Sequence, residues 1–497
     1  MIKTQGKDMN LKFLKITICL LFFVLLFIAK TNAQQTLTLW QCIEIAKDRG
    51  YSAKMLNNIY KQKKENYRAF RSGYYPQLSL SGSAPGLTRT IRTFPINGND
   101  LFFPQSQLSS YLNLNLTQSI PLTGGEISLS SGVSRIDILE TNESMLWRST
   151  PINLSISQPI FRFNPYPWDS KENELNYEMA DRQLVEGLED ISIEVTTKFF
   201  DLYIKQMQVE NALKNVAVND TLYQLAQGRF QVGTIAENDL LQSELALSNK
   251  KIELENAMLD YSRASEDLLK TMGFEGTEEF TFLPPFELPD FEVSAEKALE
   301  MALQNRSDRI DFELQKLRAE RELKRTERIN SFGATINASI GYNQSAGNLP
   351  KVYKDLLDQE SLNLSFTVPI VQWGKGSAEY EAALANSERV LTSVEKSKYE
   401  FDLEVKYQIL RFKQLQKQVA VAARADTIAA RRFDVAKNRY IIGKIDMNSL
   451  FIAQNEKDAA MQSYIYTLQN YWISYFRIRR LSLYDFQANK PLYSGKN

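Results

Sequence analysis

Few of the side chains that usually carry out chemistry are available in this sequence. Histidine is absent from the 497 residues, and cysteine occurs only twice, as Cys19 and Cys42. The absence of histidine excludes histidine-dependent nucleophile triads and the usual zinc sites. Carboxylates are abundant, but they fall beside Lys and Arg on expected helix faces, where solvated surface is their usual role. We therefore expect no catalytic residues, no cofactor and no bound metal.

Residues 1–33 have the pattern of a secretory signal peptide. Lys12 and Lys15 precede an apolar run over 16–29, and small residues end at Ala33. This run is shorter than the roughly 20 residues of a membrane-spanning helix, and no comparable run follows. We expect cleavage before Gln34 and export of a mature chain whose single cysteine, Cys42, allows no intrachain disulfide.

The charge of the chain is balanced. Lysine and arginine together number 59, as do aspartate and glutamate. Such a chain has no excess of positive charge to bind phosphate groups, so we expect no nucleic-acid partner.

The mature sequence repeats itself at a spacing of 210 residues. A gapless offset of this length indicates two copies of one structural unit. We place the first repeat at 34–279, a connector at 280–292, the second repeat at 293–484 and a C-terminal tail at 485–497. The matching pairs are Asn153 and Asn363, Leu154 and Leu364, Ser155 and Ser365, Pro159 and Pro369, Arg229 and Arg439, and Gly233 and Gly443.

Each repeat contains a long heptad pattern. An apolar residue recurs at every seventh position from Leu188 to Phe230, and again from Val405 to Tyr440 with Asp426 as a polar interruption. A period of 3.5 residues predicts left-handed coiled-coil packing. A continuous helix over 169–230 would extend roughly 90 Å.

A second heptad pattern follows a glycine in each repeat. Glycine supplies the left-handed backbone that ends a helix, so we expect antiparallel helical hairpins that turn at Gly233 and Gly443. Shorter helical patterns over 39–71 and 293–328 open the two repeats.

Strands are expected before each long helix. Ile152, Leu154 and Ile156 alternate with Asn and Ser, and 361–368 alternates in the same way. The polar positions are Ser, Asn, Thr and Gln rather than Lys and Glu, which suits a wet lumen, while the apolar face would meet lipid. This pattern favours a transmembrane barrel over a soluble sandwich. Aromatic residues that suit a membrane interface lie near the expected strand ends: Tyr74, Tyr75, Tyr342 and Trp373.

One chain cannot close such a barrel with two equivalent strand pairs, because small closed barrels need about eight strands. Lipid does not tolerate open strand edges, so several chains must share one barrel. The simplest solution is a ring of identical subunits that each give four strands, and three of them would give twelve.

The first repeat is longer than the second. The opening helices are offset by 256 residues rather than 210, which leaves an excess of about 46 residues before the proline of the first copy. Alternating residues near 111–135 predict an extra hairpin that turns at Gly124 and Gly125. The sequence leaves open whether it widens the barrel or forms an external loop.

The ordered combination of these features resembles the TolC-like outer-membrane efflux proteins over essentially the whole mature chain. The resemblance implies a mixed α and β fold in which a homotrimer shares one transmembrane β-barrel and a long periplasmic coiled-coil α-helical barrel. It implies a passive export duct in the outer membrane, for efflux or type I secretion, without catalysis. The implied partners are the lipid bilayer, a periplasmic adaptor and an inner-membrane pump.

The resemblance also assigns roles to individual residues. Pro159 and Pro369 match the strand exits, and Asp239 and Tyr440 match an aspartate and tyrosine pair of the periplasmic gate. A basic gate residue is replaced by Ile445, and Ser449 and Ile452 stand where the family's acidic pore positions are expected, so an acidic selectivity ring is in doubt. The matching adaptor-contacting tips are Val232, Gly233, Thr234, Ile442, Gly443 and Lys444.

Two other interpretations are open. A periplasmic adaptor or structural coiled-coil protein would share the helical hairpins but would not need lipid-facing strands. An exported enzyme is supported only by the size of the chain.

Overall fold

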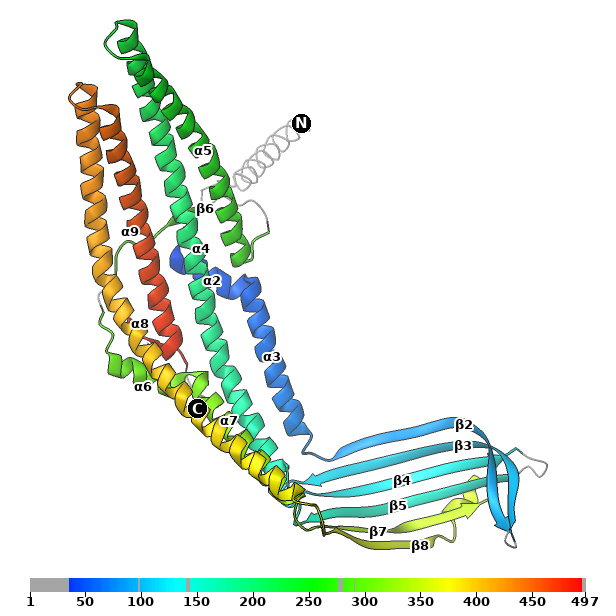
Figure 1. Ribbon diagram of the computed structural model, residues 1–497. Helices are drawn as coiled ribbons and strands as arrows, with labels where there is room; N and C mark the ends of the chain where they lie inside the picture. The colour runs from blue at the N-terminus through cyan, green and yellow to red at the C-terminus, as the bar shows by residue number, and fades with distance from the viewer. Residues whose placement is uncertain (1–34, 97–98, 140–143, 276–279, 290, 494–497) are drawn as a thin grey trace, which may run out of the picture. The chain divides into compact units, whose positions relative to one another are not determined.

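The computed structural model describes residues 35–493 except 97–98, 140–143, 276–279 and 290 (Figure 1). The expected signal peptide therefore lies outside the described residues. The chain divides into two compact units. The hairpin unit comprises 190–290, 412–476 and the segment up to 54, and the sheet unit comprises 55–189, 291–411 and 477–497.

Two very long helices dominate the chain. They are α4 (Tyr166–Gln231) with 66 residues and α8 (Lys375–Ile441) with 67 residues. Each is followed by a helix of 36 residues, α5 (Glu237–Met272) and α9 (Met447–Ser482). At 1.5 Å per residue α4 is about 100 Å long. The prediction of a long helix and a hairpin in each repeat is confirmed, and Figure 1 shows both pairs.

The heptad prediction holds better in the second repeat than in the first. The expected row of α8 is buried at five positions: Val405, Phe412, Val419, Phe433 and Tyr440. In α4 the expected row is buried at Val195 and Leu202, and Phe230 at its end is exposed. Further along α4 the buried residues belong to another side of the helix. They are Ala212, Asn215, Asn219, Leu222 and Ala226.

Each shorter helical pattern is interrupted once. Gly50 separates α2 (Leu39–Arg49) from α3 (Tyr51–Ser72), and Arg306 separates α6 (Ala295–Asn305) from α7 (Ser307–Ile329). At Gly50 a Cβ atom would lie 2.8 Å from the carbonyl oxygen of Thr271, so the close approach of α5 requires glycine there.

The hairpin unit has an aromatic core beside a small parallel sheet. β1 (Gln35–Thr38) pairs with β6 (Phe280–Leu283), which lies inside the segment expected as a connector. The Trp40 ring packs edge-on against Trp472 and Phe476 with centroid distances of 5.8 and 5.4 Å. The Trp472 indole N–H donates to the Pro285 carbonyl oxygen at 3.2 Å. The start of α2, the connector and α9 therefore share one core.

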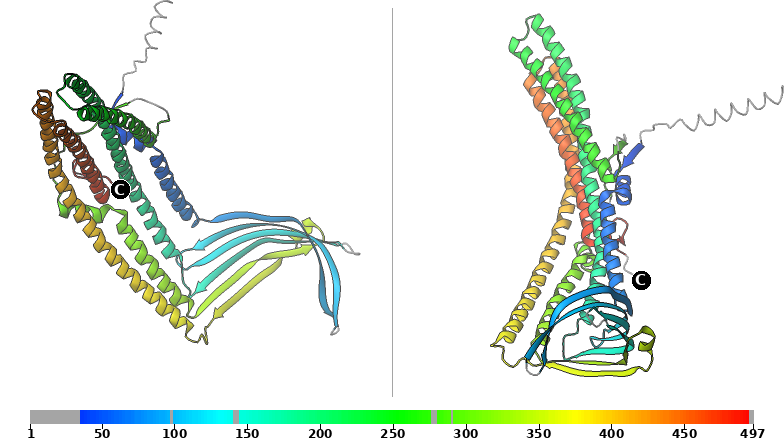
Figure 2. Two further views of the ribbon diagram at one scale, coloured as in Figure 1. Left: turned by 45° about the horizontal axis from the view of Figure 1, so that its top comes forward. Right: turned by 90° about the vertical axis from the view of Figure 1, so that its right-hand side faces the viewer.

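The sheet unit contains one antiparallel sheet of six strands in the order β2-β3-β4-β5-β7-β8. Figure 2 shows the six strands side by side. The expected extra hairpin is β3–β4, and it is an integral part of this sheet. The first repeat thus gives four strands and the second gives two, where the equivalent pairs alone would give four in total. The strands are β2 (Gln77–Ile96), β3 (Asn99–Ile120), β4 (Gly125–Ile138), β5 (Ser144–Ile160), β7 (Gly333–Ala346) and β8 (Leu357–Thr367).

A short helix, η1 (Leu349–Tyr353), connects β7 to β8. Its Val352 is fully buried, and the Val352 carbonyl accepts a hydrogen bond from the Ser149 hydroxyl of β5. This hydrogen bond fixes the β7–β8 connection to β5.

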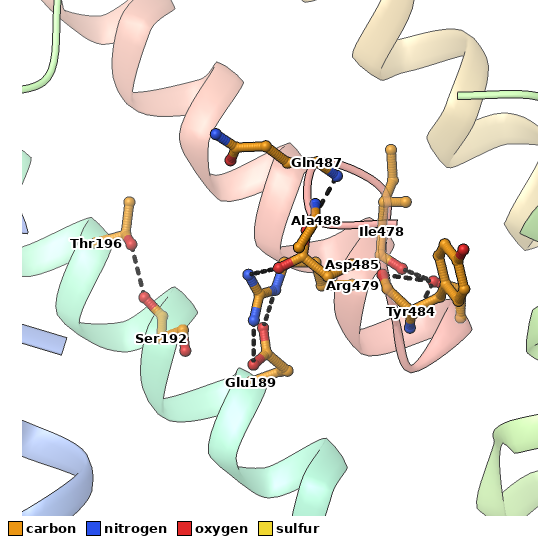
Figure 3. Close-up of polar contacts among 10 residues, drawn as sticks. Glu189, Ser192, Thr196, Ile478, Arg479, Tyr484, Asp485, Gln487 and Ala488 are labelled. Carbon is orange, nitrogen blue, oxygen red and sulfur yellow. Dashed lines mark hydrogen bonds and ion pairs between the residues drawn. The ribbon is translucent and has the colours of Figure 1, made fainter. Parts of the chain in front are cut away.

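A buried ion network holds the C-terminal tail in the sheet unit (Figure 3). The Arg479 guanidinium on α9 binds both carboxylate oxygens of Glu189 on α4, at 2.9 and 3.2 Å. It also binds the Asp485 carboxylate at 2.9 Å. Asp485 ends β9 (Tyr484–Asp485), which pairs with β10 (Lys490–Pro491), and its other oxygen accepts the N–H groups of Gln487 and Ala488. The network joins α4 of the first repeat to the end of the second.

We expect Glu189→Ala to lower the free energy of unfolding by roughly 3 kcal/mol, because it leaves the buried Arg479 charge without its bidentate partner. The Glu189 and Arg479 side chains are only 4% and 12% exposed. The measurement is thermal or denaturant unfolding of the detergent-solubilised protein, followed by circular dichroism.

The control is Glu313→Ala, which breaks an ion pair to Arg309 whose side chains are 48% and 50% exposed. We expect it to change the stability by less than about 0.5 kcal/mol. Equal effects of the two variants would contradict a structural role for the network.

Candidate functional site

The tip of the first helical hairpin is a tight turn built on Gly233. Its φ of +73° is in the left-handed region that only glycine adopts freely. The Gly233 N–H donates to the Phe230 carbonyl at 2.9 Å, and the Thr234 N–H donates to the Arg229 carbonyl at 2.9 Å. This pair of bonds is the Schellman motif, which satisfies the last carbonyls of α4.

The tip of the second hairpin has the same bonds. Gly443 has a φ of +71°. Its N–H donates to the Tyr440 carbonyl at 2.9 Å, and the Lys444 N–H donates to the Arg439 carbonyl at 2.8 Å. The sequence repeat therefore extends to individual hydrogen bonds of the turns.

Both tips present apolar side chains to solvent. Val232 is 73% exposed and Ile442 is 63% exposed, although such residues are usually buried. The Arg229 guanidinium lies 3.5 Å from the Ile441 carbonyl oxygen, so the two turns are adjacent within the hairpin unit. The six residues predicted as tips are thus brought together, and Arg229, which was not predicted, links them. Its recurrence as Arg439 was the available signal.

The helices that return from the tips begin differently. The Asp446 carboxylate accepts the Ser449 N–H at 2.7 Å and caps the start of α9. This hydrogen bond and the Ser449 hydroxyl lower the pKa of Asp446. At the equivalent place before α5 stands Ala236, which has no side-chain cap. Ser449, at a position where the family's pore is acidic, is therefore tied to a helix cap.

Both members of the predicted gate pair lie in the hairpin unit. Tyr440 is only 7% exposed and packs against Leu222 and Leu450. Burial raises the pKa of the Tyr440 hydroxyl, the Arg229 charge opposes this, and the Asp239 charge adds to it. Arg229 lies over the Tyr440 ring at 5.7 Å. Asp239, in the first turn of α5, is exposed to solvent.

A polar layer interrupts the helical core below the tips. It contains Asp426 and Lys457, the polar members of the two heptad rows in the second repeat. Burial raises the pKa of Asp426, and the Lys457 charge opposes the rise. The Lys457 ammonium donates to the Asn211 side-chain oxygen at 2.9 Å and lies 4.7 Å from the centre of the Phe433 ring. Such layers fix the register of coiled helices at some cost in stability.

The six-stranded sheet exposes one apolar face. Leu362, Leu364 and Phe366 of β8 all point to this face and are exposed, whereas Asn363 and Ser365 point to the other. A contiguous apolar surface of this kind marks contact with another protein or with a membrane. The sheet is therefore suited to surroundings that are apolar on one side and wet on the other.

The strand exits lie where the sheet meets the helices. Pro159 is inside β5 opposite Thr335, and Pro369 follows the end of β8. Exposed aromatic rings lie nearby in sequence: Tyr75 precedes β2, Phe161 follows β5 and the 95% exposed Trp373 precedes α8. Tyr342 lies within β7, and Tyr74 is half-buried with its hydroxyl donating to the Tyr166 carbonyl at 3.4 Å.

The described residues include no group of three or more His, Cys, Asp and Glu placed to hold a metal ion. None of the helices in the described part of the chain is both long enough and apolar enough to span a membrane.

Comparisons with known proteins agree on one family. The family described as outer membrane efflux protein matches two segments, 60–274 and 298–482. No curated protein matches the sequence. The chain is similar to the solved CmeC outer membrane channel of Campylobacter jejuni, with a TM-score of 0.65 and 14% identity over 92% of this chain and 87% of that one.

Two further solved structures are similar at the same level of identity. The outer membrane protein VceC of Vibrio cholerae has a TM-score of 0.60 and 14% identity over 92% of this chain and 97% of that one. The MtrE outer membrane channel of Neisseria gonorrhoeae, in an open state, has a TM-score of 0.59 and 14% identity over 92% and 91%. These likenesses show the fold, and the two matched segments show its internal repeat.

We expect Asp446→Ala to speed amide hydrogen exchange in the first turn of α9, because the Ser449 N–H loses its acceptor. The pKa of Asp446 is lowered in the folded chain. The cap therefore stabilises the helix above the ordinary carboxylate pKa, and its contribution disappears as the pH falls through the folded pKa. Exchange of the first turn of α5, which Ala236 leaves uncapped, serves as the internal control. Equal exchange in variant and wild type at neutral pH would argue against the cap.

Proposed function

The chain belongs to the outer membrane efflux protein family, and from this premise we propose that it is a passive export channel of the outer membrane. The observation that carries the proposal is the two-sided sheet, with exposed Leu and Phe on one face and Ser, Asn, Thr and Gln on the other. In a barrel the apolar face meets lipid and the polar face lines a water-filled passage.

Three copies of the chain share the proposed barrel. A backbone polar group left unpaired in lipid costs several kcal/mol, and β2 and β8 are the two ends of the strand order in one chain. Pairing these edges between copies removes the cost. The trimer rests on the family resemblance, and so do the periplasmic helical tunnel, the adaptor and the inner-membrane pump.

Transport without catalysis fits the side chains present. The proposed passage is lined mainly by Ser, Asn, Thr and Gln, and the chain has no histidine, the base that most often activates a serine. The passage therefore limits the size of the cargo and gives it a water-filled path. Selection of cargo and the supply of energy belong to the pump and adaptor. No cofactor or metal is part of the proposal.

We expect the mature protein to sediment with outer membranes and to give a native mass of three chains in detergent. The free strand edges and the apolar face require both outcomes. Density fractionation followed by native mass spectrometry measures them. A monomer that stays in solution without detergent would refute the channel and would favour a periplasmic coiled-coil protein.

For the gate, we expect Asp239→Ala combined with Tyr440→Phe to raise single-channel conductance in planar bilayers. The variant removes a carboxylate and a hydroxyl that we propose bind a neighbouring coil, and Phe keeps the packing of the buried ring. The control, Asp434→Ala with Tyr466→Phe, removes the same groups from exposed positions on α8 and α9. If both double variants conduct like the wild type, these residues have no gating role.

For the tips, we expect Val232→Asp with Ile442→Asp to reduce export while trimers persist. These exposed side chains make little contribution to folding, so the added charges act on a docking partner. Gln227→Asp adds the same kind of charge to the exposed surface of α4 about one turn away and is expected to leave export unchanged. Export assays in cells, with native gels for the trimer, distinguish the two effects. Normal export by the tip variant would argue against docking there.

A further inference from the structure

The second repeat contributes two strands to the sheet, β7 and β8. The first repeat contributes β2 and β5 and, in addition, the hairpin β3–β4. Its two strands have 22 and 14 residues, which accounts for most of the excess length of the first repeat. We propose that this added hairpin is part of the barrel wall, so that each copy contributes six strands and pairs its β8 edge with the β2 edge of a second copy. The inference rests on the proposed channel function and extends it to the construction of the wall.

The register of the sheet carries the argument. A row of Leu78, Leu116, Leu129, Leu154 and Ile340 is apolar on five strands, where these residues stand opposite one another in turn, and it ends in Glu360 on β8. Directly opposite residues of antiparallel strands point to the same face. The hairpin members of this row therefore face the same side as those of the flanking strands.

A polar row runs beside the apolar one and crosses all six strands. It consists of Gln77, Thr117, Ser128, Ser155, Ser339 and Ser361, again opposite one another in turn. A slip of one residue in either hairpin strand would exchange its faces. The added hairpin thus carries both surfaces that a wall between lipid and water requires.

Exposure of the hairpin matches that of the flanking strands. Leu114 is 42% exposed and Leu154 on β5 is 46% exposed. A hairpin folded outside the wall would instead need polar side chains on both faces, since water would reach both.

The turn between β3 and β4 is fixed to the helix end of the sheet. Gly124 has a φ of +79° and donates its N–H to the Ile120 carbonyl at 2.9 Å. The Asn164 amide, just before α4, donates to the Pro121 carbonyl at 2.9 Å. The Gln118 amide donates to the Tyr74 carbonyl at 2.9 Å, between α3 and β2. The hairpin is therefore tied at its base to the strand–helix junctions on both sides.

The free edges of the sheet suit each other. β2 begins after α3 and runs away from the helices, whereas β8 ends before α8 and runs toward them. The β8 edge of one copy can therefore pair with the β2 edge of the next in the antiparallel sense that the other strands use. Inserting two strands preserves this relation, while one inserted strand would reverse it. The edges also differ in charge on one face, where β8 carries Asp358 and Glu360 and β2 carries Arg89.

A single copy cannot join its own edges. With neighbouring strands about 4.8 Å apart, five spacings separate β2 from β8 by roughly 24 Å along the sheet, and closure takes about eight strands. Three copies give eighteen strands instead of the twelve that four per copy would give. Because barrel diameter grows almost linearly with strand number, the barrel is about half again as wide.

The test places single cysteines on both faces of the hairpin, in a Cys42→Ala background that removes the only other cysteine of the mature chain. Leu114→Cys and Leu129→Cys probe the apolar face, and Asn115→Cys and Ser130→Cys probe the polar face. A fluorophore on each cysteine is exposed to brominated lipid in vesicles or to iodide in water. The controls on the flanking strands are Leu154→Cys, Ile340→Cys, Asn153→Cys and Ser339→Cys.

We expect lipid to quench the two leucine positions as strongly as Leu154→Cys and Ile340→Cys, and iodide to quench the polar positions. Quenching of both hairpin faces by iodide, while lipid still quenches Leu154→Cys and Ile340→Cys, would overturn the inference and leave the channel intact. If lipid quenches neither Leu154→Cys nor Ile340→Cys, the channel itself is overturned.

Disulfide formation between copies tests the edge pairing. Double variants combine Ser79→Cys, Ser81→Cys or Ser83→Cys on β2 with Gln359→Cys, Ser361→Cys or Asn363→Cys on β8. Cα atoms more than 7 Å apart cannot be bridged, so any disulfide must join two copies. We expect covalent trimers on non-reducing gels for at least one combination. Trimers that form only when Ser130→Cys on β4 replaces the β2 cysteine would overturn the edge pairing, because β4 would then be the edge of the wall and β2 and β3 would lie outside it.

Discussion

A strand at the edge of a sheet leaves every second N–H and C=O group without a partner, and hydrocarbon offers none. In this chain the constraint falls on β2 and β8, because the intervening pairs, from β2–β3 to β7–β8, are satisfied internally. Leu and Phe side chains beside these edges are exposed, and contact of that face with water would be unfavourable. We propose that other copies of the same sheet pair with these edges, because hydrocarbon offers the backbone no other hydrogen-bonding partner.

The two repeats are alike where the backbone turns and different where they are anchored. Gly233 and Gly443 end their helices with the same pair of hydrogen bonds. By contrast, the β3–β4 hairpin belongs to the first repeat alone, and so does the carboxylate of Glu189 that holds Arg479 near the end of the second. Duplication supplied a common frame, and the departures from it make the two halves depend on each other.

Much of this architecture could be predicted from the sequence, because its signals are periodic and local. Heptads gave the long helices, glycines gave the tips, and alternation gave the strands. The joining of the extra hairpin to the sheet needed the register, in which Leu116 and Leu129 face each other. The buried side in the second half of α4 was misplaced because a heptad row does not show which side of so long a helix is covered along its length. Arg229 and the Glu189–Arg479 pair were missed because each joins elements that are far apart in the sequence. The roles of the tip and gate residues stay predictions.

The unequal starts of the returning helices bear on stoichiometry. Asp446 caps α9 beyond a tip that carries Lys444, whereas Ala236 leaves α5 uncapped beyond a tip that carries Thr234. In the ring of three copies that we propose, the two kinds of tip would alternate. A partner that binds only one kind would saturate that ring at three molecules, and one that binds both kinds would saturate it at six.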